Sequence, residues 1–328
     1  MSKAAVPPLA TRVLAGDRRA LAQAITLAES TRPEDRMAAE ALVAALLPRT
    51  GDAVRIGISG PPGVGKSTLI ERFGLHLVAA GHRIAVLAVD PSSKVSGGSI
   101  LGDKTRMAEL AARGEAFIRP SPAGTTLGGV ARRTREALLL CEAAGFDIVV
   151  VETVGVGQSE AAVADMTDLL ILLVQPGGGD DLQGIKRGIV ELADLLVVTK
   201  ADGDLAAAAG RAAADYRNAL HQLRGADRGG WFPPVLQCSG LTGQGVPEIW
   251  DAIEQFRGAA EISGRFAGRR ADQALAWLRE ELSQGLADWL AADAGLARRL
   301  AEAEAAVSAG SALPPAAARS LLLALRGG

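Results

Sequence analysis

The feature that most constrains this chain is a glycine-rich segment, residues 60–67, which reads G-P-P-G-V-G-K-S and fills the pattern G-x-x-x-x-G-K-S/T. It follows a β-branched run at residues 54–59 and precedes an amphipathic stretch at residues 68–78, the strand–loop–helix context of a phosphate-binding loop. Glycines let successive backbone N–H groups surround a phosphate, and the start of the helix adds partial positive charge. We expect Lys66 to bridge phosphate oxygens and Ser67 to ligate Mg²⁺. The residues predicted to bind nucleotide here are Gly60, Pro61, Pro62, Gly63, Val64, Gly65, Lys66, Ser67 and Thr68.

Short, nearly continuous apolar runs alternate with helical stretches through the middle of the chain. Such runs are typical of strands buried on both faces, as in a parallel sheet covered by helices. Each run ends at a polar or glycine-rich segment, and open α/β sheets bind ligands at the carboxyl ends of their strands. The sequence therefore predicts an α/β fold, a P-loop NTPase with a mostly parallel central sheet, flanked by helical N- and C-terminal extensions. The predicted strands are residues 54–59, 84–90, 148–152, 169–174, 195–200 and 234–238.

Three compositional zones indicate how the chain is divided. Residues 1–50 are predicted to form a helical N-terminal extension, in which Asp17 caps one helix and Pro33 begins the next. Residues 51–260 are predicted to form the nucleotide domain. In residues 261–328 apolar side chains recur at the 3- and 4-residue spacing of a helix–helix seam, which favours a helical C-terminal dimerisation arm, although packing within the chain is nearly as good an explanation. The members of this stripe are Leu275, Leu278, Leu282, Leu286 and Trp289.

Three carboxylates are candidates for holding magnesium. Asp90 and Glu152 end predicted strands, so both should face the phosphate site, and Asp103 lies in a glycine-rich segment that could fold over the nucleotide. Magnesium takes hard oxygen ligands, usually a few from protein and the rest from water. We therefore expect Ser67, Asp90, Asp103 and Glu152 at the metal, and Lys66, Asp103 and Glu152 in catalysis. Asp103 is also the candidate for orienting the attacking water.

The residues that select the base are expected directly after the apolar run at residues 195–198. They read T-K-A-D and depart from the usual N-K-x-D only at the first position, Thr199. The Asp202 carboxylate can accept hydrogen bonds from guanine N1–H and the exocyclic amine, a pair of donors that adenine does not offer. Lys200 can lie along the purine face. Thr199 can keep one short hydrogen bond, but not the two-sided bridge that an asparagine amide makes.

A second loop follows the last predicted strand. Backbone N–H groups of Ser239, Gly240 and Leu241 are expected near guanine O6, with an ordinary strand-to-helix turn as the other explanation. Together with the phosphate loop, these residues predict GTP or GDP and Mg²⁺ as the bound cofactors.

Composition excludes several other classes of protein. The net charge of −2 argues against broad electrostatic binding to nucleic acid, and an aromatic content of 3% leaves few platforms for base stacking. Two cysteines are too few for a disulfide framework or a four-cysteine zinc site. The first residues lack the apolar core of a signal peptide, and the longest membrane-compatible apolar run, residues 169–174, falls far below the ~20 residues that span a bilayer. We expect a cytoplasmic protein without nucleic-acid or membrane partners.

Four segments together resemble one family of GTPases. They are P-P-G-V-G-K-S in the phosphate loop, D-P-S-S beginning at Asp90, G-G-S-I-L-G-D-K at residues 97–104, and E-T-V-G at residues 152–155, where many GTPases have D-x-x-G. With glutamate in that position, the combination resembles the MeaB/ArgK family over nearly the whole chain. The resemblance places Gly155 among the nucleotide-binding residues.

The resemblance, and not composition or spacing, implies a specific activity. It implies a homodimeric, Mg²⁺-dependent GTPase that is a chaperone of the adenosylcobalamin-dependent methylmalonyl-CoA mutase, where it gates cofactor loading and protects or reactivates the mutase. It also implies mobile switch loops, including residues 175–186, which are glycine-rich, charged and suited to order–disorder switching. A passive connection is the alternative reading of that segment.

The water-positioning glutamine of many GTPases does not follow Gly155 here, because Val156 does, and Gln158 comes two residues later. Phosphoryl transfer depends on positioning and on neutralising charge, so we expect slow intrinsic hydrolysis that a partner accelerates.

Other functions stay open. An ATP-dependent P-loop kinase would not need Asp202, and a metal-delivery GTPase for another metalloenzyme usually carries His- or Cys-rich segments that this chain lacks. A dimeric scaffold that binds nucleotide without hydrolysis is a further alternative.

Overall fold

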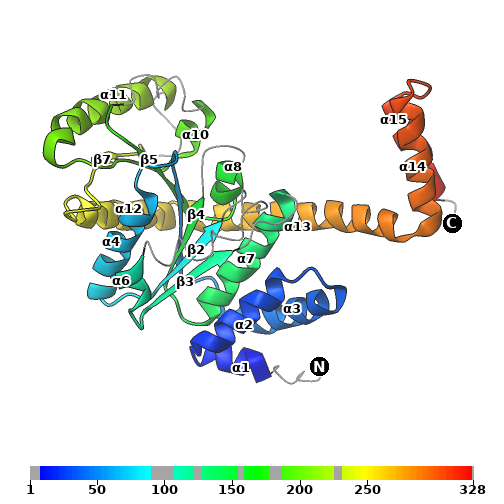
Figure 1. Cartoon of the computed structure of the whole chain (residues 1–328), viewed down its shortest axis with the longest axis horizontal. Coiled ribbons are helices and arrows are strands. Elements are labelled where there is room, and N and C mark those ends of the chain that lie inside the picture. Colours follow the sequence, from blue (N-terminus) through cyan, green and yellow to red (C-terminus); the bar gives the residue numbers. More distant parts are fainter. Residues whose placement is uncertain are drawn as a thin grey trace. The chain divides into compact units, whose positions relative to one another are not determined.

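The computed structural model describes residues 8–89, 107–121, 127–153, 159–177, 187–224 and 231–326. The chain forms two compact units, Met1–Arg270 and Ala271–Gly328. The first unit contains a sheet with the helices that cover it, and the described part of the second is helical (Figure 1).

One sheet of seven strands runs through the described part of the first unit. Its strands are β1 (Val54–Ser59), β2 (Ile84–Val89), β3 (Ala116–Ser121), β4 (Ile148–Thr153), β5 (Leu169–Val174), β6 (Leu195–Val198) and β7 (Val235–Gln237). They lie in the order β3-β2-β4-β1-β5-β6-β7, and all neighbours are parallel. The carboxyl ends of all the strands therefore lie at one edge of the sheet, where open α/β sheets bind ligands.

The predicted α/β class and parallel sheet are confirmed, but the sequence pattern missed β3. Its sequence, A-F-I-R-P-S, contains only a short apolar run before Arg119 and Pro120. β3 lies at the edge of the sheet and pairs with β2 alone. An edge strand tolerates proline, because one row of its backbone groups takes no part in sheet pairing. The continuous apolar pattern used to find buried strands is therefore weak in such a strand.

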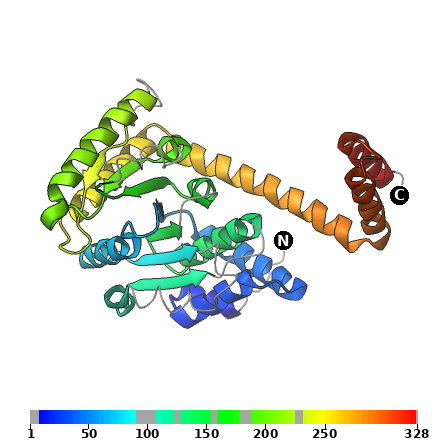
Figure 2. The same cartoon turned by 45° about the horizontal axis from the view of Figure 1, so that its top comes forward.

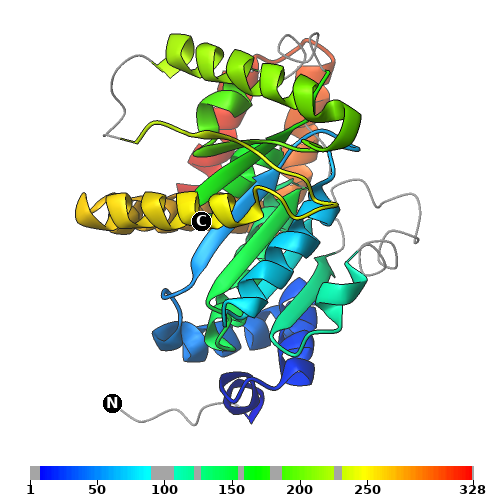
Figure 3. The same cartoon turned by 90° about the vertical axis from the view of Figure 1, so that its left-hand side faces the viewer.

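Helices cover both faces of the sheet (Figures 1 and 2). α4 (Lys66–Ala79) and α12 (Val246–Ile262) contact each other on one face, which Figure 3 shows from the side. Alternate side chains of β4 point to opposite faces, with Ile148 and Val150 in the core beneath these two helices and Val149 and Val151 in the core on the other side. Apolar residues at every strand position are thus explained by burial on both sides.

The other face is covered by the remaining helices of the first unit. They are α1 (Pro8–Leu14), α2 (Arg18–Glu29), α3 (Pro33–Leu46), α7 (Leu127–Ala143), α8 (Ser159–Ala164), α10 (Arg187–Leu192) and α11 (Ala206–Arg224); the short helix α6 (Ala108–Ala111) packs against α4, and η1 (Leu47–Arg49) and η2 (Gly203–Leu205) are 3₁₀ turns. The N-terminal helices share a core with α7, in which Leu21 and Ile25 are fully buried. Asp17 caps α2 as predicted, with its carboxylate accepting from the N–H groups of Arg19 and Ala20.

The root of the long helix α13 (Arg265–Ala292) is tied to the amino end of β1 by a buried ion pair. Arg270 donates to both carboxylate oxygens of Asp168 at 2.7 Å and to the carbonyl oxygens of Gly51 and Ala53. Asp168 is 2% exposed and also accepts from the N–H of Arg55 at 2.8 Å. Burial lowers the pKa of Arg270, but its hydrogen bonds with Asp168 and the charge of that carboxylate outweigh burial and raise it. The guanidinium is therefore charged and fixed.

The second unit contains the rest of α13, α14 (Ala294–Ser308) and α15 (Pro314–Arg326). α14 and α15 contact each other. The five members of the apolar stripe on α13 are 50–64% exposed in the single chain. Packing between described residues of the chain therefore does not bury the stripe. Among the helices that the structure describes, none combines the length and the apolar composition needed to cross a bilayer.

Candidate nucleotide-binding site

The phosphate loop connects the end of β1 to the start of α4. Gly60 passes so close to β5 that a Cβ atom there would lie 2.6 Å from the carbonyl oxygen of Leu173. Gly65 is the N-cap of α4 with φ of 96°, a left-handed conformation that side chains other than glycine rarely adopt. The two glycines thus meet different needs, one for close packing and one for backbone conformation. The loop carries its amide groups to the N-terminus of a helix, which is an anion-binding arrangement.

Lys66 lies inside this loop. Its Nζ atom donates to the carbonyl oxygens of Gly60 at 2.7 Å and Pro61 at 3.1 Å, and the residue is only 8% exposed. A buried ammonium group needs oxygen partners, because transfer of a charge out of water without them is very costly. The side chain is therefore held where phosphate oxygens would meet the loop.

Ser67 and Glu152 come together from α4 and β4. The Oγ atom of Ser67 donates to Oε1 of Glu152 at 3.3 Å, and Glu152 is 3% exposed at the carboxyl end of its strand. A hydroxyl and a carboxylate are hard oxygen donors, so this pair fits Mg²⁺, which keeps several non-protein ligands. The described residues contain no group of three or more His, Cys, Asp or Glu side chains that could hold a metal. Asp90, Asp103 and Gly155, the other residues expected here, lie outside the described residues.

A cavity of about 430 Å³ opens beside the phosphate loop. It is lined by residues of three segments that are distant in sequence: the phosphate loop with the start of α4, the stretch from the end of β6 through η2, and the loop after β7. Its lining residues are Val64, Gly65, Thr68, Leu69, Thr199, Lys200, Asp202, Asp204, Leu205, Gly240 and Leu241. The T-K-A-D segment thus lies next to the loop after β7, as a base-binding site requires. Leu69, Asp204 and Leu205 also line the cavity but were not predicted from the sequence. Only Asp204 and Leu205, which follow shortly after Asp202, had a signal in their position.

Thr199 connects the cavity to the phosphate loop. Its Oγ1 atom lies 2.7 Å from the carbonyl oxygen of Val64 and 3.1 Å from that of Val174. A hydroxyl has one proton, so the shorter contact is the main hydrogen bond. On the facing side, Gly240 approaches α4 so closely that a Cβ atom there would lie 3.1 Å from Cγ2 of Thr68. The hydrogen bond of Thr199 and the close approach of Gly240 therefore both connect the base cavity to the phosphate loop and α4.

The loop after β7 begins with two buried residues, Cys238 and Ser239. Ser239 is fully buried and accepts from the N–H of Thr242 at 3.1 Å, so it shapes the loop but does not line the cavity. Burial, together with the negative charge of Asp202, raises the pKa of the Cys238 thiol to about 12. The thiol therefore stays protonated and unreactive near neutral pH.

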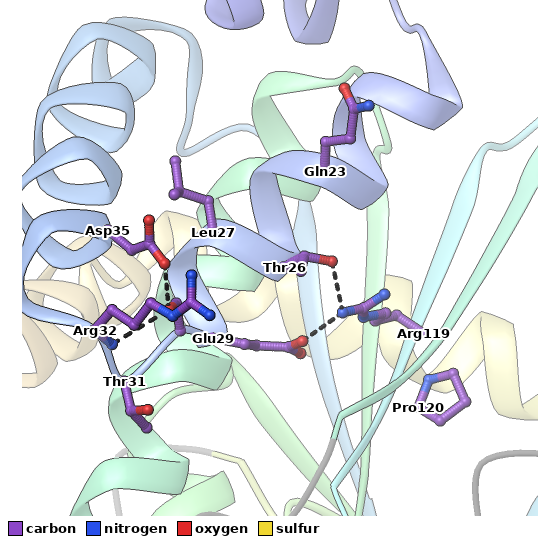
Figure 4. A pocket seen from close by; sticks show the side chains of 10 residues that line it. Gln23, Thr26, Leu27, Glu29, Thr31, Arg32, Asp35, Arg119 and Pro120 are labelled. Atoms are coloured by element: carbon purple, nitrogen blue, oxygen red, sulfur yellow. Dashed lines mark hydrogen bonds and ion pairs between the residues drawn. The ribbon is translucent and has the colours of Figure 1, made fainter.

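A second, larger cavity of about 720 Å³ lies between α2, the start of α3 and β3 (Figure 4). Three of its charged side chains have partners within the chain: Arg119 pairs with Glu29 and donates to Thr26, and Asp35 accepts from Ser30 at 2.6 Å. None of the residues predicted from sequence to bind nucleotide or metal lines this cavity. The contacts of Arg119 attach α2 to the edge strand β3, and the Ser30–Asp35 contact joins the end of α2 to α3.

A parallel sheet, a glycine-rich loop before α4 and a T-K-A-D base pocket define a P-loop GTPase. A model of the family described as "Methylmalonyl Co-A mutase-associated GTPase MeaB" matches residues 21–294. The chain belongs to this family, as the resemblance predicted, and it is accordingly a GTPase that binds guanine nucleotide.

Individual proteins agree with the family assignment. GTPase ArgK of Escherichia coli is 50% identical over 86% of this chain and 85% of its own length. The mouse protein named "Methylmalonic aciduria type A homolog, mitochondrial" is 46% identical over 98% of this chain and 80% of its own length. The crystal structure of a LAO/AO transport system kinase superposes with a TM-score of 0.78 at 39% identity and covers 99% of both chains.

Proposed function

We propose that this GTPase is a chaperone of the adenosylcobalamin-dependent methylmalonyl-CoA mutase. In this role it couples GTP binding and hydrolysis to cofactor loading and to protection or reactivation of the mutase. The observation that carries the proposal is the family match over residues 21–294, since the family is described by its association with that mutase. The name of the mouse relative, which refers to methylmalonic aciduria, supports the same client.

The proposed chemistry divides between the two ends of the site. At the phosphate end, Lys66 would exchange its loop carbonyl partners for phosphate oxygens, and Ser67 and Glu152 would hold Mg²⁺ together with Asp90 and Asp103. Bound there, Mg²⁺ would neutralise the charge that develops on the phosphate oxygens. Lys66, Asp103 and Glu152 are the residues we propose for catalysis. These residues would supply charge and position, and no covalent intermediate with the protein is required.

At the base end, Asp202 would accept hydrogen bonds from guanine while Lys200 lies along the purine. The co-lining of one cavity by Asp202, Lys200, Gly240 and Leu241 supports this assignment. Adenine would be disfavoured, because it does not offer this pair of donors and the Asp202 carboxylate would lose both hydrogen bonds.

We also propose that the chain works as a homodimer. The division into residues 1–50, 51–260 and 261–328 assigns dimerisation to the last segment, through its C-terminal helices. The exposed apolar stripe on α13 supports this, because side chains at seam spacing gain most from burial against another helix.

The protective role is tested by following purified mutase during prolonged turnover. We expect mutase activity to decay more slowly with the wild-type GTPase and GTP than with the Lys66→Ala variant and GTP. A non-hydrolysable GTP analogue with the wild-type protein separates the effect of binding from that of hydrolysis, and the cobalamin absorbance spectrum reports loading. Equal decay of mutase activity in all mixtures would contradict the proposal.

A further inference from the structure

Lys200 has a backbone conformation that its surroundings must hold in place. Its φ of 55° lies in the left-handed region, which is unfavourable for a residue with a side chain. The neighbouring residues fix the chain on both sides: the N–H of Thr199 donates to the carbonyl oxygen of Val174 at 2.8 Å, and the N–H of Ala201 donates to that of Cys238 at 3.0 Å. Such conformations persist where the structure over-determines them, and they gather at functional sites.

The side chain of Lys200 is fixed as well, by a residue that lies outside the cavity lining. Nζ donates to Oε1 of Gln175 at 3.1 Å. β5 and β6 pair in parallel with Val174 opposite Val198, so Gln175 and Lys200 follow neighbouring strand ends. An ammonium group only donates, so the contact requires the oxygen of the Gln175 amide to face Lys200. Both residues are half-buried.

Two carboxylates share the cavity with Lys200 and would compete for its ammonium group. Asp202 and Asp204 both line it. An ion pair between Lys200 and Asp202 would occupy the carboxylate that the base needs. A neutral amide oxygen outside the cavity gives the ammonium another partner and leaves the carboxylate available.

We propose that Gln175 is a positioning residue for nucleotide binding. It holds Nζ of Lys200 at the rim of the cavity, so that the aliphatic stem of the lysine is already placed along the purine face. A lysine stem is flexible, and fixing it before binding reduces the ordering that binding must impose. Because the purine face is common to different bases, Gln175 strengthens binding without selecting guanine, whereas Asp202 does the selecting.

The test compares Gln175→Met with the wild type, since methionine keeps the length of the side chain and removes the acceptor. We expect GDP and inosine diphosphate, which lacks the exocyclic amine, to bind about 3- to 10-fold more weakly, by the same factor for both. Asp202→Ala should instead weaken GDP more than inosine diphosphate. Gln175→Glu, which keeps an acceptor, should restore affinity, and Gln237→Met at the neighbouring strand end, where the side chain is exposed, should leave both dissociation constants unchanged.

Hydrolysis and a double-mutant cycle distinguish positioning from a general structural role. Gln175→Met should raise KM for GTP and leave kcat unchanged, because the contact is the same in the ground and transition states. In a Lys200→Ala background it should have no further effect on GDP binding. Additive losses in that background, a fall in kcat, or unchanged affinity in Gln175→Met would each overturn the proposal. Urea unfolding without nucleotide checks the fold, and if Gln175→Met is unstable, Gln175→Asn, which shortens the reach of the amide, tests the same contact.

Discussion

Thr199 shows how one side chain joins the two ends of the nucleotide site. Its hydroxyl lies 2.7 Å from the carbonyl oxygen of Val64 in the phosphate loop, while its chain neighbour Lys200 lines the base cavity. One short hydrogen bond was expected from this threonine, and the contact with Val64 is such a bond. Thr199 and Lys200 both follow the end of β6, so the position of the base cavity depends on that of the phosphate loop.

Asp202 carries the prediction on base selection. Asp202→Asn places an amide donor opposite the guanine N1–H and exocyclic amine, so GTP should bind about 10- to 100-fold more weakly. Xanthosine triphosphate, which has an oxygen in place of the amine, should gain affinity. The dissociation constants of GTP and xanthosine triphosphate, determined for the wild type and for Asp202→Asn, measure this change in base preference. Asp204→Asn, two residues away in the same cavity lining, is the matched control, and an equal effect of both variants would contradict the role given to Asp202.

At the scale of elements, the strands that are buried along their length could be predicted from the sequence, whereas the edge strand β3 could not. β4 and β5 are buried along their whole length, and their apolar runs gave their positions to within a residue. β3, with Arg119 and Pro120, has an edge strand's weaker pattern. The same difference holds for the cavity. Its motif residues at strand ends could be predicted from the sequence, whereas Leu69 and Gln175 take part through tertiary contacts that no local sequence pattern encodes.

The root of α13 is the element whose attachment can be tested. Arg270→Met leaves the buried carboxylate of Asp168 without its guanidinium, which should lower the free energy of unfolding by about 3–5 kcal/mol. Urea unfolding followed by circular dichroism measures the change. Arg257→Met, which breaks the exposed pair with Glu261 on α12, should cost less than about 1 kcal/mol. Adding Asp168→Asn to Arg270→Met should recover part of the loss, and no recovery would argue against a buried-charge penalty.

At the scale of the whole molecule, the two compact units differ in how their apolar side chains are used. The first unit buries its apolar residues in cores on both faces of the sheet. The second leaves the stripe of Leu275, Leu278, Leu282, Leu286 and Trp289 half exposed. This stripe is the surface that the proposed dimer would bury, so assembly is the property that it should control.

The proposed dimer gives a direct prediction for that stripe. Leu278→Arg combined with Leu282→Arg places charges in the proposed seam and should convert a dimer to a monomer, as measured by light scattering after size-exclusion chromatography. Nucleotide affinity should persist, because the base cavity lies in the first unit. Leu313→Arg is the matched control, since Leu313 is 74% exposed but lies outside the stripe. A wild-type protein that is monomeric at micromolar concentration would contradict the assignment.

The most direct test of the whole account is phosphate release from GTP and ATP in parallel, with and without purified methylmalonyl-CoA mutase. We expect turnover that is selective for GTP, slow for the GTPase alone and faster when the mutase is present. Equal use of ATP would contradict the base assignment and favour a P-loop kinase. GTP turnover that the mutase leaves unchanged would contradict the proposed client.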